Sequence, residues 1–318
     1  MKILIFTSIG IILVNIIIAS SLEIFFMFYN PYNIEKRWNY IEEEVGSTNF
    51  NGTRLQGQLN AMGLRDKEYP FEHNTYRILS IGDSFTYGFL LKNCNSWPKK
   101  TETYVRNDGY TSVEIINGGI PGFNTKQEYE FFAKTTYRFN PDMIIIGFVI
   151  NDATTLCSNC GAVTLKQKFD EQIASTKNMF GLYTINYFKL TALQRKLTET
   201  TINEYSEPYE KESKEFQQCK EAFLKFKAMS ITNHFKLVVV IYPVLCQLNE
   251  KYPFQQIHQK MLIFFNQSEI EAYDLTPTFY GYKDVELWVS SEDSHPNTKA
   301  NEIASKKIAN IIEGHLKN

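Results

Sequence analysis

Residue types that suit nucleophilic catalysis stand at separate points of the sequence, each at the end of a regular stretch. Ser84 follows the apolar run RILSIGD, Asn151 follows MIIIGFVI, and His295 comes shortly before the last helical pattern. A hydroxyl activated by a neighbouring imidazole, together with donors for a developing oxyanion, is what acyl transfer requires. The sequence therefore predicts acyl-transfer chemistry, provided that the fold brings these residues together.

Three groups in the sequence are suited to stabilise an oxyanion. Ser84 follows a predicted strand and opens a predicted helix, so its backbone N–H is available as a donor. Gly122, in NGGIPGFNT, offers a backbone N–H with no side chain to block an acyl group, and Asn151 offers a side-chain amide. Each also has an ordinary structural explanation, since serine and asparagine cap helices and glycine forms turns. The catalytic interpretation depends on their meeting at one place.

The segment SSEDSHPN supplies a base and two candidate acids. His295 is the natural general base, although a histidine in a loop is commonly a solvated surface residue. Asp293 and Glu292 lie on the same predicted loop, and either carboxylate is able to fix the tautomer of the imidazole. Asp83, directly before Ser84, is expected to hold the turn by hydrogen bonds rather than to take part in catalysis.

Apolar β-branched runs alternate with helical patterns from residue 76 onward. This alternation is typical of strand–helix–strand units and a parallel sheet, and MIIIGFVI and KLVVVIY are apolar on both faces, as expected for central strands. The ends of such strands share one edge of the sheet, which would bring Ser84, Asn151 and His295 together. Residues 155–215 show no strand pattern and predict either a partly helical insertion over the sheet or a solvated excursion. NAMGLRDKEYP, at 60–70, predicts a short lead-in strand and turn.

The four polar segments resemble the sequence blocks of the SGNH (GDSL) hydrolase family. They are IGDSFTYG, NGGIPGFNT, GFVINDA and EDSHPN, within residues 76–318, and CNSWPKK and GLRDKEYP are similar to segments of membrane-anchored bacterial members. The resemblance implies a flavodoxin-like three-layer α/β/α sandwich with a five-stranded parallel sheet. It also implies Ser84 as nucleophile, His295 as base, and an oxyanion hole formed by Ser84, Gly122 and Asn151. It implies neither a metal nor an organic cofactor.

Two positions depart from the family pattern. Val149 stands where the third block usually has a glycine, which leaves the Asn151 donor intact. The acid of the family commonly lies three residues before the histidine, which is Glu292 here, whereas the Asp-x-His-Pro-Asn form of many relatives assigns Asp293. We assign the acid to Asp293 because a triad is defined by geometry rather than by fixed spacing, and Glu292 stays an alternative.

By this resemblance the chain is expected to be a serine esterase that hydrolyses acyl esters through Ser84, His295 and Asp293. The expected substrates are O-acetyl or other short acyl esters of a cell-envelope carbohydrate or lipid. An O-acyltransferase acting on a surface polysaccharide would use the same triad, and a non-catalytic binding protein on this fold is a third hypothesis. The presence of Ser84, Gly122, Asn151 and His295 together argues against a loss of activity.

The N-terminal run over residues 3–22 carries no charge, and about 20 apolar residues are enough to span a bilayer as a helix. It predicts a signal anchor or a cleaved signal peptide within residues 1–29, followed by a juxtamembrane lead-in over residues 30–75. Membrane contact through residues 3–29 would place the catalytic domain outside the cytoplasm, either anchored or, after cleavage, secreted. We favour the anchor because apolar character resumes after Glu23 as IFFMFY.

Charge and cysteine content argue against two further classes of function. The formal net charge of −2 provides no excess of cations for a phosphate backbone, so nucleic acid is not an expected partner. Cys157 and Cys160 form the one close pair among five cysteines, and no second tight pair completes a zinc site. This pair is expected to be either a disulfide in an oxidising compartment or two loop thiols. The sequence carries no indication of oligomeric state.

Overall fold

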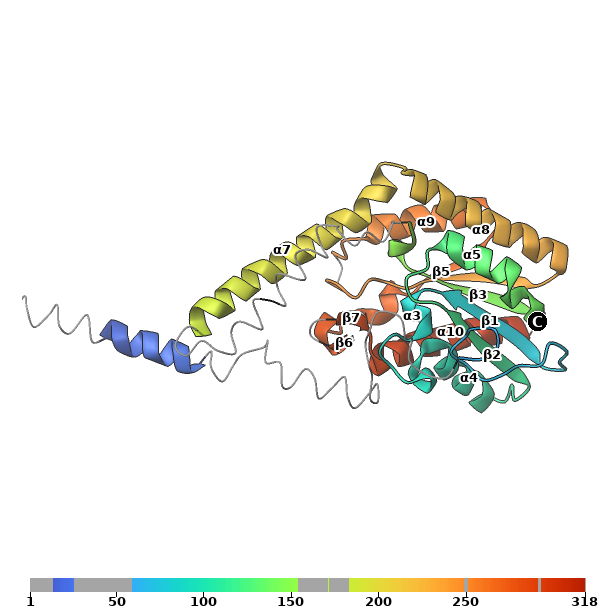
Figure 1. Cartoon of the computed structure of the whole chain (residues 1–318), viewed down its shortest axis with the longest axis horizontal. Coiled ribbons are helices and arrows are strands. Elements are labelled where there is room, and N and C mark those ends of the chain that lie inside the picture. The colour runs from blue at the N-terminus through green and yellow to red at the C-terminus, as the bar shows by residue number, and fades with distance from the viewer. Residues whose placement is uncertain are drawn as a thin grey trace, which may run out of the picture. The chain divides into compact units, whose positions relative to one another are not determined.

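Figure 1 shows the computed structural model of the chain, which describes residues 14–25, 59–153, 171, 183–248, 251–290 and 293–317. The chain divides into two compact units. The first comprises Met1–Arg37 and Cys157–Glu204, and the second comprises Trp38–Leu156 and Tyr205–Asn318. Every candidate catalytic residue predicted from the sequence belongs to the second unit.

The second unit is built on a five-stranded parallel sheet, which confirms the predicted sheet. In the spatial order β2-β1-β3-β4-β5, its strands are Tyr76–Gly82 (β1), Val113–Gly119 (β2), Met143–Phe148 (β3), Lys236–Ile241 (β4) and Glu271–Asp274 (β5). Isoleucine and valine are the commonest residues of β3 and β4, and almost every side chain of β1 to β4 is buried, as expected for a sheet covered on both faces. The order is that of flavodoxin-like sheets, in which ligands bind at the switch point between β1 and β3.

Helices complete three layers (Figure 1). The helices are Ser84–Tyr87 (α3), Trp97–Asn107 (α4), Thr125–Lys134 (α5), Tyr183–Glu210 (α7), Lys214–Asn233 (α8), Gln255–Gln267 (α9) and Thr298–Leu316 (α10). Short 3-10 turns cover Asn93–Asn95 (η1), Thr136–Phe139 (η2), Ile150–Ala153 (η3), Thr276–Phe279 (η4) and Asp284–Glu286 (η5). α4 and α10 pack together beside β2, whereas α5 packs against α8 on the other face of the sheet.

Capping residues fix where two of these helices begin. The side chain of Asn124 accepts a hydrogen bond from the backbone N–H of Gln127 (3.0 Å), and the side chain of Gln127 accepts one from the N–H of Asn124 (3.1 Å). Asn297 caps α10 on one side only, because its side chain accepts a hydrogen bond from the N–H of Ala300 (3.0 Å). The chain therefore leaves β2 for α5, and enters α10, at defined residues near the carboxyl edge of the sheet.

A small hairpin that the sequence analysis did not predict precedes α10. Trp288–Ser290 (β6) pairs antiparallel with Asp293–Pro296 (β7), in the register Ser290 to Asp293. Asp293 and His295 therefore lie on a strand, whereas the sequence analysis places them on a loop. Backbone pairing holds this segment in an extended conformation, in which alternate side chains share a face. Asp293 and His295 are two residues apart and consequently point to the same side.

The predicted lead-in strand at residues 60–70 is wrong. These residues form consecutive turns, because the side chain of Asn60 accepts hydrogen bonds from the backbone N–H groups of Met62 and Leu64, both at 3.0 Å. Gly63 adopts the left-handed conformation with φ of 78°. An asparagine followed by such a glycine favours a turn over an extended strand.

The described part of the first unit consists of a helix over residues 14–25, residue 171 and the larger part of α7, residues 183–204. The carboxylate of Glu23 accepts hydrogen bonds from the backbone N–H groups of Tyr183 (2.7 Å) and Thr184 (3.3 Å), which have no acceptor within α7. Among the described residues, no helix combines the length and the apolar character needed to cross a bilayer. Residues 3–13 of the predicted membrane segment lie outside the described residues, as do Cys157 and Cys160, so both predictions stay predictions.

Candidate active site

Ser84 is the first residue of α3, directly after the end of β1. Asp83 caps this helix, because its Oδ1 accepts a hydrogen bond from the backbone N–H of Phe85 at 2.8 Å. A residue at the first helical position has no intrahelical acceptor for its own N–H. The backbone N–H of Ser84 is therefore positioned, together with its hydroxyl, at the carboxyl edge of the sheet.

The ends of β2 and β3 approach α3 closely because both carry glycine. A Cβ added to Gly119 would overlap the backbone of Tyr87, and one added to Gly147 would overlap the hydroxyl of Thr86. In register, these two glycines flank Gly82 at the end of β1. Side chains at these positions would push α3 away from the sheet, so the glycines fix the height of Ser84 above the strand ends.

His295 and Asp293 reach Ser84 from β7. Nε2 of His295 lies 2.8 Å from Oγ of Ser84, and Nδ1 of His295 lies 2.5 Å from Oδ1 of Asp293. Because an ionised carboxylate only accepts hydrogen bonds, Nδ1 carries the proton in this arrangement and Nε2 is left to accept the proton of the serine. The three side chains form a continuous hydrogen-bonded chain from carboxylate to hydroxyl.

The surroundings of His295 favour its protonated form. Burial lowers the pKa of the imidazole, but the negative charge of Asp293 and its hydrogen bond, with a further contribution from Asp83, raise the pKa above its ordinary value. The rings of Phe85 and Phe89 lie 5.5 and 4.8 Å from the imidazole ring. The base is thus held between two aromatic side chains and a carboxylate.

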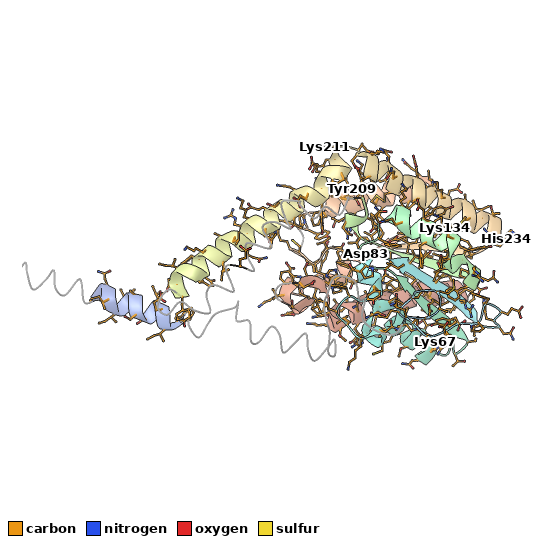
Figure 2. All side chains as sticks on the ribbon, in the orientation of Figure 1. Lys67, Asp83, Lys134, Tyr209, Lys211 and His234 are labelled. Carbon is orange, nitrogen blue, oxygen red and sulfur yellow. The ribbon has the colours of Figure 1, made fainter. Side chains whose placement is uncertain are left out.

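Asn151 lies in η3, directly after β3, and contacts the residue that caps α3. Its side-chain Nδ2 donates a hydrogen bond to Oδ2 of Asp83 at 2.9 Å. This bond holds the amide of Asn151 beside the turn that carries Ser84, and its role as an oxyanion donor stays a prediction. Burial raises the pKa of Asp83, and its hydrogen bonds from Asn151 and Phe85 oppose that rise. Figure 2 labels Asp83 at the start of α3.

Gly122 lies in the connection between β2 and α5, with φ of 80°. The start of this connection is held beside the end of β1, because the backbone N–H of Ile120 donates to the carbonyl oxygen of Gly82 at 2.9 Å. Glycine is favoured at such a φ because it has no Cβ. The loop is thus fixed next to the turn that carries Ser84, and the role of Gly122 as an oxyanion donor stays a prediction.

The structure brings together Ser84, His295, Asp293 and, through Asp83, Asn151. Glu292, the alternative acid, lies outside the described residues. Val149, which replaces the expected glycine, is buried, and its carbonyl oxygen accepts a hydrogen bond from the backbone N–H of Asp152 at 3.0 Å. Among the described residues, no group of three or more histidine, cysteine, aspartate or glutamate side chains is placed to hold a metal ion.

Two further carboxyl groups are buried behind the site, and the sequence analysis missed both. Glu128 on α5 and Asp152 in η3 are only 2% and 3% exposed, and neither oxygen of Glu128 makes a hydrogen bond to a described residue. Burial raises the pKa of both groups well above the usual range, the charge of Asp83 adds to the rise in both, and Glu128 adds to it in Asp152. The carboxyl of Glu128 therefore keeps its proton to higher pH than an exposed glutamic acid does.

We expect Glu128→Gln to stabilise the protein increasingly as the pH rises. A carboxyl whose folded-state pKa is raised contributes stability that is fully present below its unfolded pKa and is lost as the pH rises toward the folded value. The neutral amide has no proton to lose, so the variant escapes this loss. Urea unfolding at about pH 5 and about pH 8 measures the difference, with exposed Glu130→Gln on the same helix as the control. If the free energies of unfolding of wild type and Glu128→Gln changed equally between the two pH values, the raised pKa of Glu128 would be contradicted.

The sequence matches no protein-family model and no curated protein. Several solved structures are similar. An esterase from Pseudoalteromonas sp. is 13% identical with a TM-score of 0.43, covering 76% of this chain and 100% of its own. A lipase/acylhydrolase from Enterococcus faecalis is 14% identical with a TM-score of 0.43, covering 76% and 97%. An acetylxylan esterase from Geobacillus stearothermophilus is 12% identical with a TM-score of 0.44, covering 74% and 93%. At these values the likeness assigns no activity to this chain.

Proposed function

We propose that this chain is a serine ester hydrolase of the SGNH (GDSL) type. The observation that carries the proposal is the hydrogen-bonded chain from Asp293 through His295 to Ser84, with separations of 2.5 and 2.8 Å. A surface serine that merely caps a helix needs neither an imidazole at its hydroxyl nor a carboxylate behind that imidazole. Nucleophile, base and orienting acid in this order are the arrangement that activates a serine for acyl transfer.

The proposed reaction has two halves. Nε2 of His295 takes the proton of the Ser84 hydroxyl as Oγ attacks the ester carbonyl carbon, and the resulting oxyanion accepts hydrogen bonds from the N–H groups of Ser84 and Gly122 and from Nδ2 of Asn151. His295 then gives its proton to the leaving alcohol, which departs and leaves an acyl-serine. In the second half His295 takes a proton from water as the water oxygen attacks the acyl carbon. The bond between that carbon and Oγ of Ser84 then breaks, His295 returns the proton to Oγ, and the carboxylic acid leaves. Asp293 stabilises the imidazolium in both halves.

We further propose that the substrates are O-acetyl or other short acyl esters of a cell-envelope carbohydrate or lipid. The resemblance of GLRDKEYP and CNSWPKK to membrane-anchored members supports this class, and the uncharged run of residues 3–22 supports a location at the outer face of a membrane. In this proposal the membrane segment holds the enzyme close to esters of the envelope, or is removed and releases it.

Hydrolysis of p-nitrophenyl esters of increasing chain length by the purified full chain tests the proposal. We expect the acetate to be turned over with a higher kcat/KM than the octanoate, and Ser84→Ala to release p-nitrophenol at least about 10⁴-fold more slowly than wild type. Equal turnover by wild type and Ser84→Ala would contradict the proposed function. If a sugar acceptor sped the loss of the ester and the acyl group were recovered on the sugar, the proposed activity would be that of an acyltransferase rather than a hydrolase.

We expect Asn151→Ala to lower kcat by about 10²- to 10³-fold, as loss of one oxyanion donor does in other acyl-transfer enzymes. KM should change little, because the hydrogen bond forms fully only in the transition state. Steady-state kinetics with p-nitrophenyl acetate measure both constants. Since the variant also removes the hydrogen bond to Asp83, its thermal midpoint is measured alongside. A raised KM with an unchanged kcat would show that Asn151 binds the substrate rather than the transition state.

A further inference from the structure

Arg65 contacts the end of the helix that begins with Ser84. It belongs to the turn segment of residues 59–70, in which Lys67 is labelled in Figure 2, and it is only 5% exposed. Its Nη1 donates a hydrogen bond to the carbonyl oxygen of Leu91 at 2.8 Å. Its Nη2 donates to the carbonyl oxygens of Tyr87 and, at 3.1 Å, Gly88. One guanidinium thus binds three carbonyl oxygens, that of the last residue of α3 and two in the connection that follows it.

Tyr87 is the last residue of α3, and its carbonyl oxygen also accepts a hydrogen bond from Nδ2 of Asn117 (3.3 Å), while that of Gly88 accepts one from the N–H of Leu91 (3.1 Å). Arg65 adds a charged donor to each. The last carbonyl groups of a helix have no intrahelical N–H partner, and a buried carbonyl without a partner destabilises the fold. Gly88 ends the helix in the left-handed conformation, with its N–H bonded to the carbonyl oxygen of Ser84 at 3.1 Å. The guanidinium also lies 4.0 Å above the ring of Tyr87, where a planar cation is attracted to the aromatic face. Arg65 therefore stabilises both the backbone and the last side chain of α3.

The neighbouring residue fixes the segment that carries Arg65. Oδ2 of Asp66 accepts hydrogen bonds from the backbone N–H of Asn117 in β2 (2.9 Å) and from the hydroxyl of Tyr69 (3.1 Å), and it lies 3.4 Å from Nζ of Lys99 on α4. The carboxylate of Asp66 is thus held by a strand and a helix of the central fold. Arg65 extends from an anchored backbone, so a displacement of α3 would have to break its contacts.

A residue in the connection after α3, Phe89, packs against the proposed catalytic base. The N–H of Phe89 donates to the carbonyl oxygen of Ser84 at 3.0 Å, and the ring of Phe89 lies 4.8 Å from the ring of His295. Arg65 binds the carbonyl oxygens on both sides of this residue, those of Gly88 and Leu91. The same guanidinium therefore fixes the helix that carries the nucleophile and the aromatic side chain that packs on the base.

We propose that Arg65 is a positioning residue for the reaction: its guanidinium clamps the C-terminal end of α3 and so holds Oγ of Ser84 in line with Nε2 of His295. This inference rests on the proposed function. A misplacement of about 1 Å in an active site costs on the order of 10²-fold in rate. A clamp at the far end of a four-residue helix controls such a shift, because the helix has no other turns to absorb it.

Arg65→Lys tests the clamp, because lysine keeps the charge but cannot span two sets of carbonyl oxygens or stack as a plane. We expect kcat for p-nitrophenyl acetate to fall by about 10- to 10²-fold, with KM within about threefold of wild type. The pH midpoint of kcat/KM should not move, since His295 and Asp293 are untouched. Arg106→Lys is the matched control, because Arg106 also donates to a backbone carbonyl, that of Val113, but does not contact α3; it should keep the wild-type kcat.

A folded Arg65→Lys with wild-type kcat, whatever its thermal midpoint, would overturn the clamp and leave Arg65 a purely structural residue. Should this variant fail to fold, Tyr87→Leu removes the ring beneath the guanidinium and is expected to lower kcat in the same direction, and an unchanged kcat there would overturn the clamp as well. Ser84→Ala, measured in parallel, separates the two claims. Loss of turnover in Ser84→Ala with full turnover in Arg65→Lys contradicts the clamp alone. Full turnover in Ser84→Ala contradicts the proposed function and the clamp with it.

Discussion

Ser84→Ala is expected to lower kcat for ester hydrolysis by about 10⁴- to 10⁶-fold while leaving KM nearly unchanged. The hydroxyl oxygen forms the acyl-enzyme, and Nε2 of His295, at 2.8 Å, is placed to accept its proton. Without it, the oxyanion donors still bind and polarise the ester, which leaves a residual rate above that in buffer. Stopped-flow and steady-state measurements with p-nitrophenyl acetate give both constants.

The control for this variant is Ser112→Ala, which removes an exposed serine directly before β2 and should keep the wild-type kcat. His295→Ala should cost about as much as Ser84→Ala, and the double variant should lose little more than either single variant. Residues that act as a unit are not additive, because removing one already abolishes the step that needs both. If the loss of kcat in the double variant equalled the product of the losses in the two single variants, Ser84 and His295 would not act together as nucleophile and base.

Asp293→Asn is expected to lower kcat by about 10⁴-fold, because an amide no longer fixes the imidazole with its proton on Nδ1. It should also move the pH profile. His295 acts as base only when neutral, so kcat/KM rises with pH through the pKa of its imidazole, which Asp293 raises. Removing that charge lowers the pKa, and the rising limb should move to lower pH. The pH dependence of kcat/KM for both proteins measures the shift.

Glu292→Gln decides between the two candidate acids. With Asp293 as the acid, this variant should keep kcat within about threefold of wild type and leave the pH midpoint in place. A larger loss in Glu292→Gln than in Asp293→Asn would transfer the role of the acid to Glu292. The comparison is well matched, because both substitutions replace a carboxylate by its isosteric amide in adjacent residues.

The strands of the central sheet are predictable from the sequence because burial on both faces leaves an unmistakable pattern. MIIIGF in β3 is apolar throughout, and so is KLVVVI in β4 after its exposed first residue, Lys236; such runs are typical of a sheet covered on both faces. The run WPKKTETYVRN coincides with α4, since proline in its first turn marks a helix start. The meeting of Ser84 and Asn151 follows from the strand order, because both residues come directly after strands flanking the switch point.

The remaining features depend on contacts that no local pattern encodes. The β6–β7 hairpin consists of strands of three and four residues, too short for an alternation to stand out. Arg65 looks like one charge in a polar segment, and only the path of the chain after α3 shows what its guanidinium binds. Glu128 is an ordinary first-turn acid of a helix by sequence, and its pKa is raised only because α5 buries its side chain.

Covalent labelling with a fluorophosphonate tests the central claim most directly, because it needs no knowledge of the natural ester. An activated serine attacks the phosphorus, expels fluoride and keeps the phosphonyl group, so the adduct marks the nucleophile itself. We predict one adduct on wild-type full-length protein, mapped by mass spectrometry to the peptide that contains Ser84, and none at that peptide in Ser84→Ala. Labelling should be slowed strongly in His295→Ala. An adduct at another residue, or no adduct on a folded wild-type protein, would contradict the assignment of Ser84 as nucleophile.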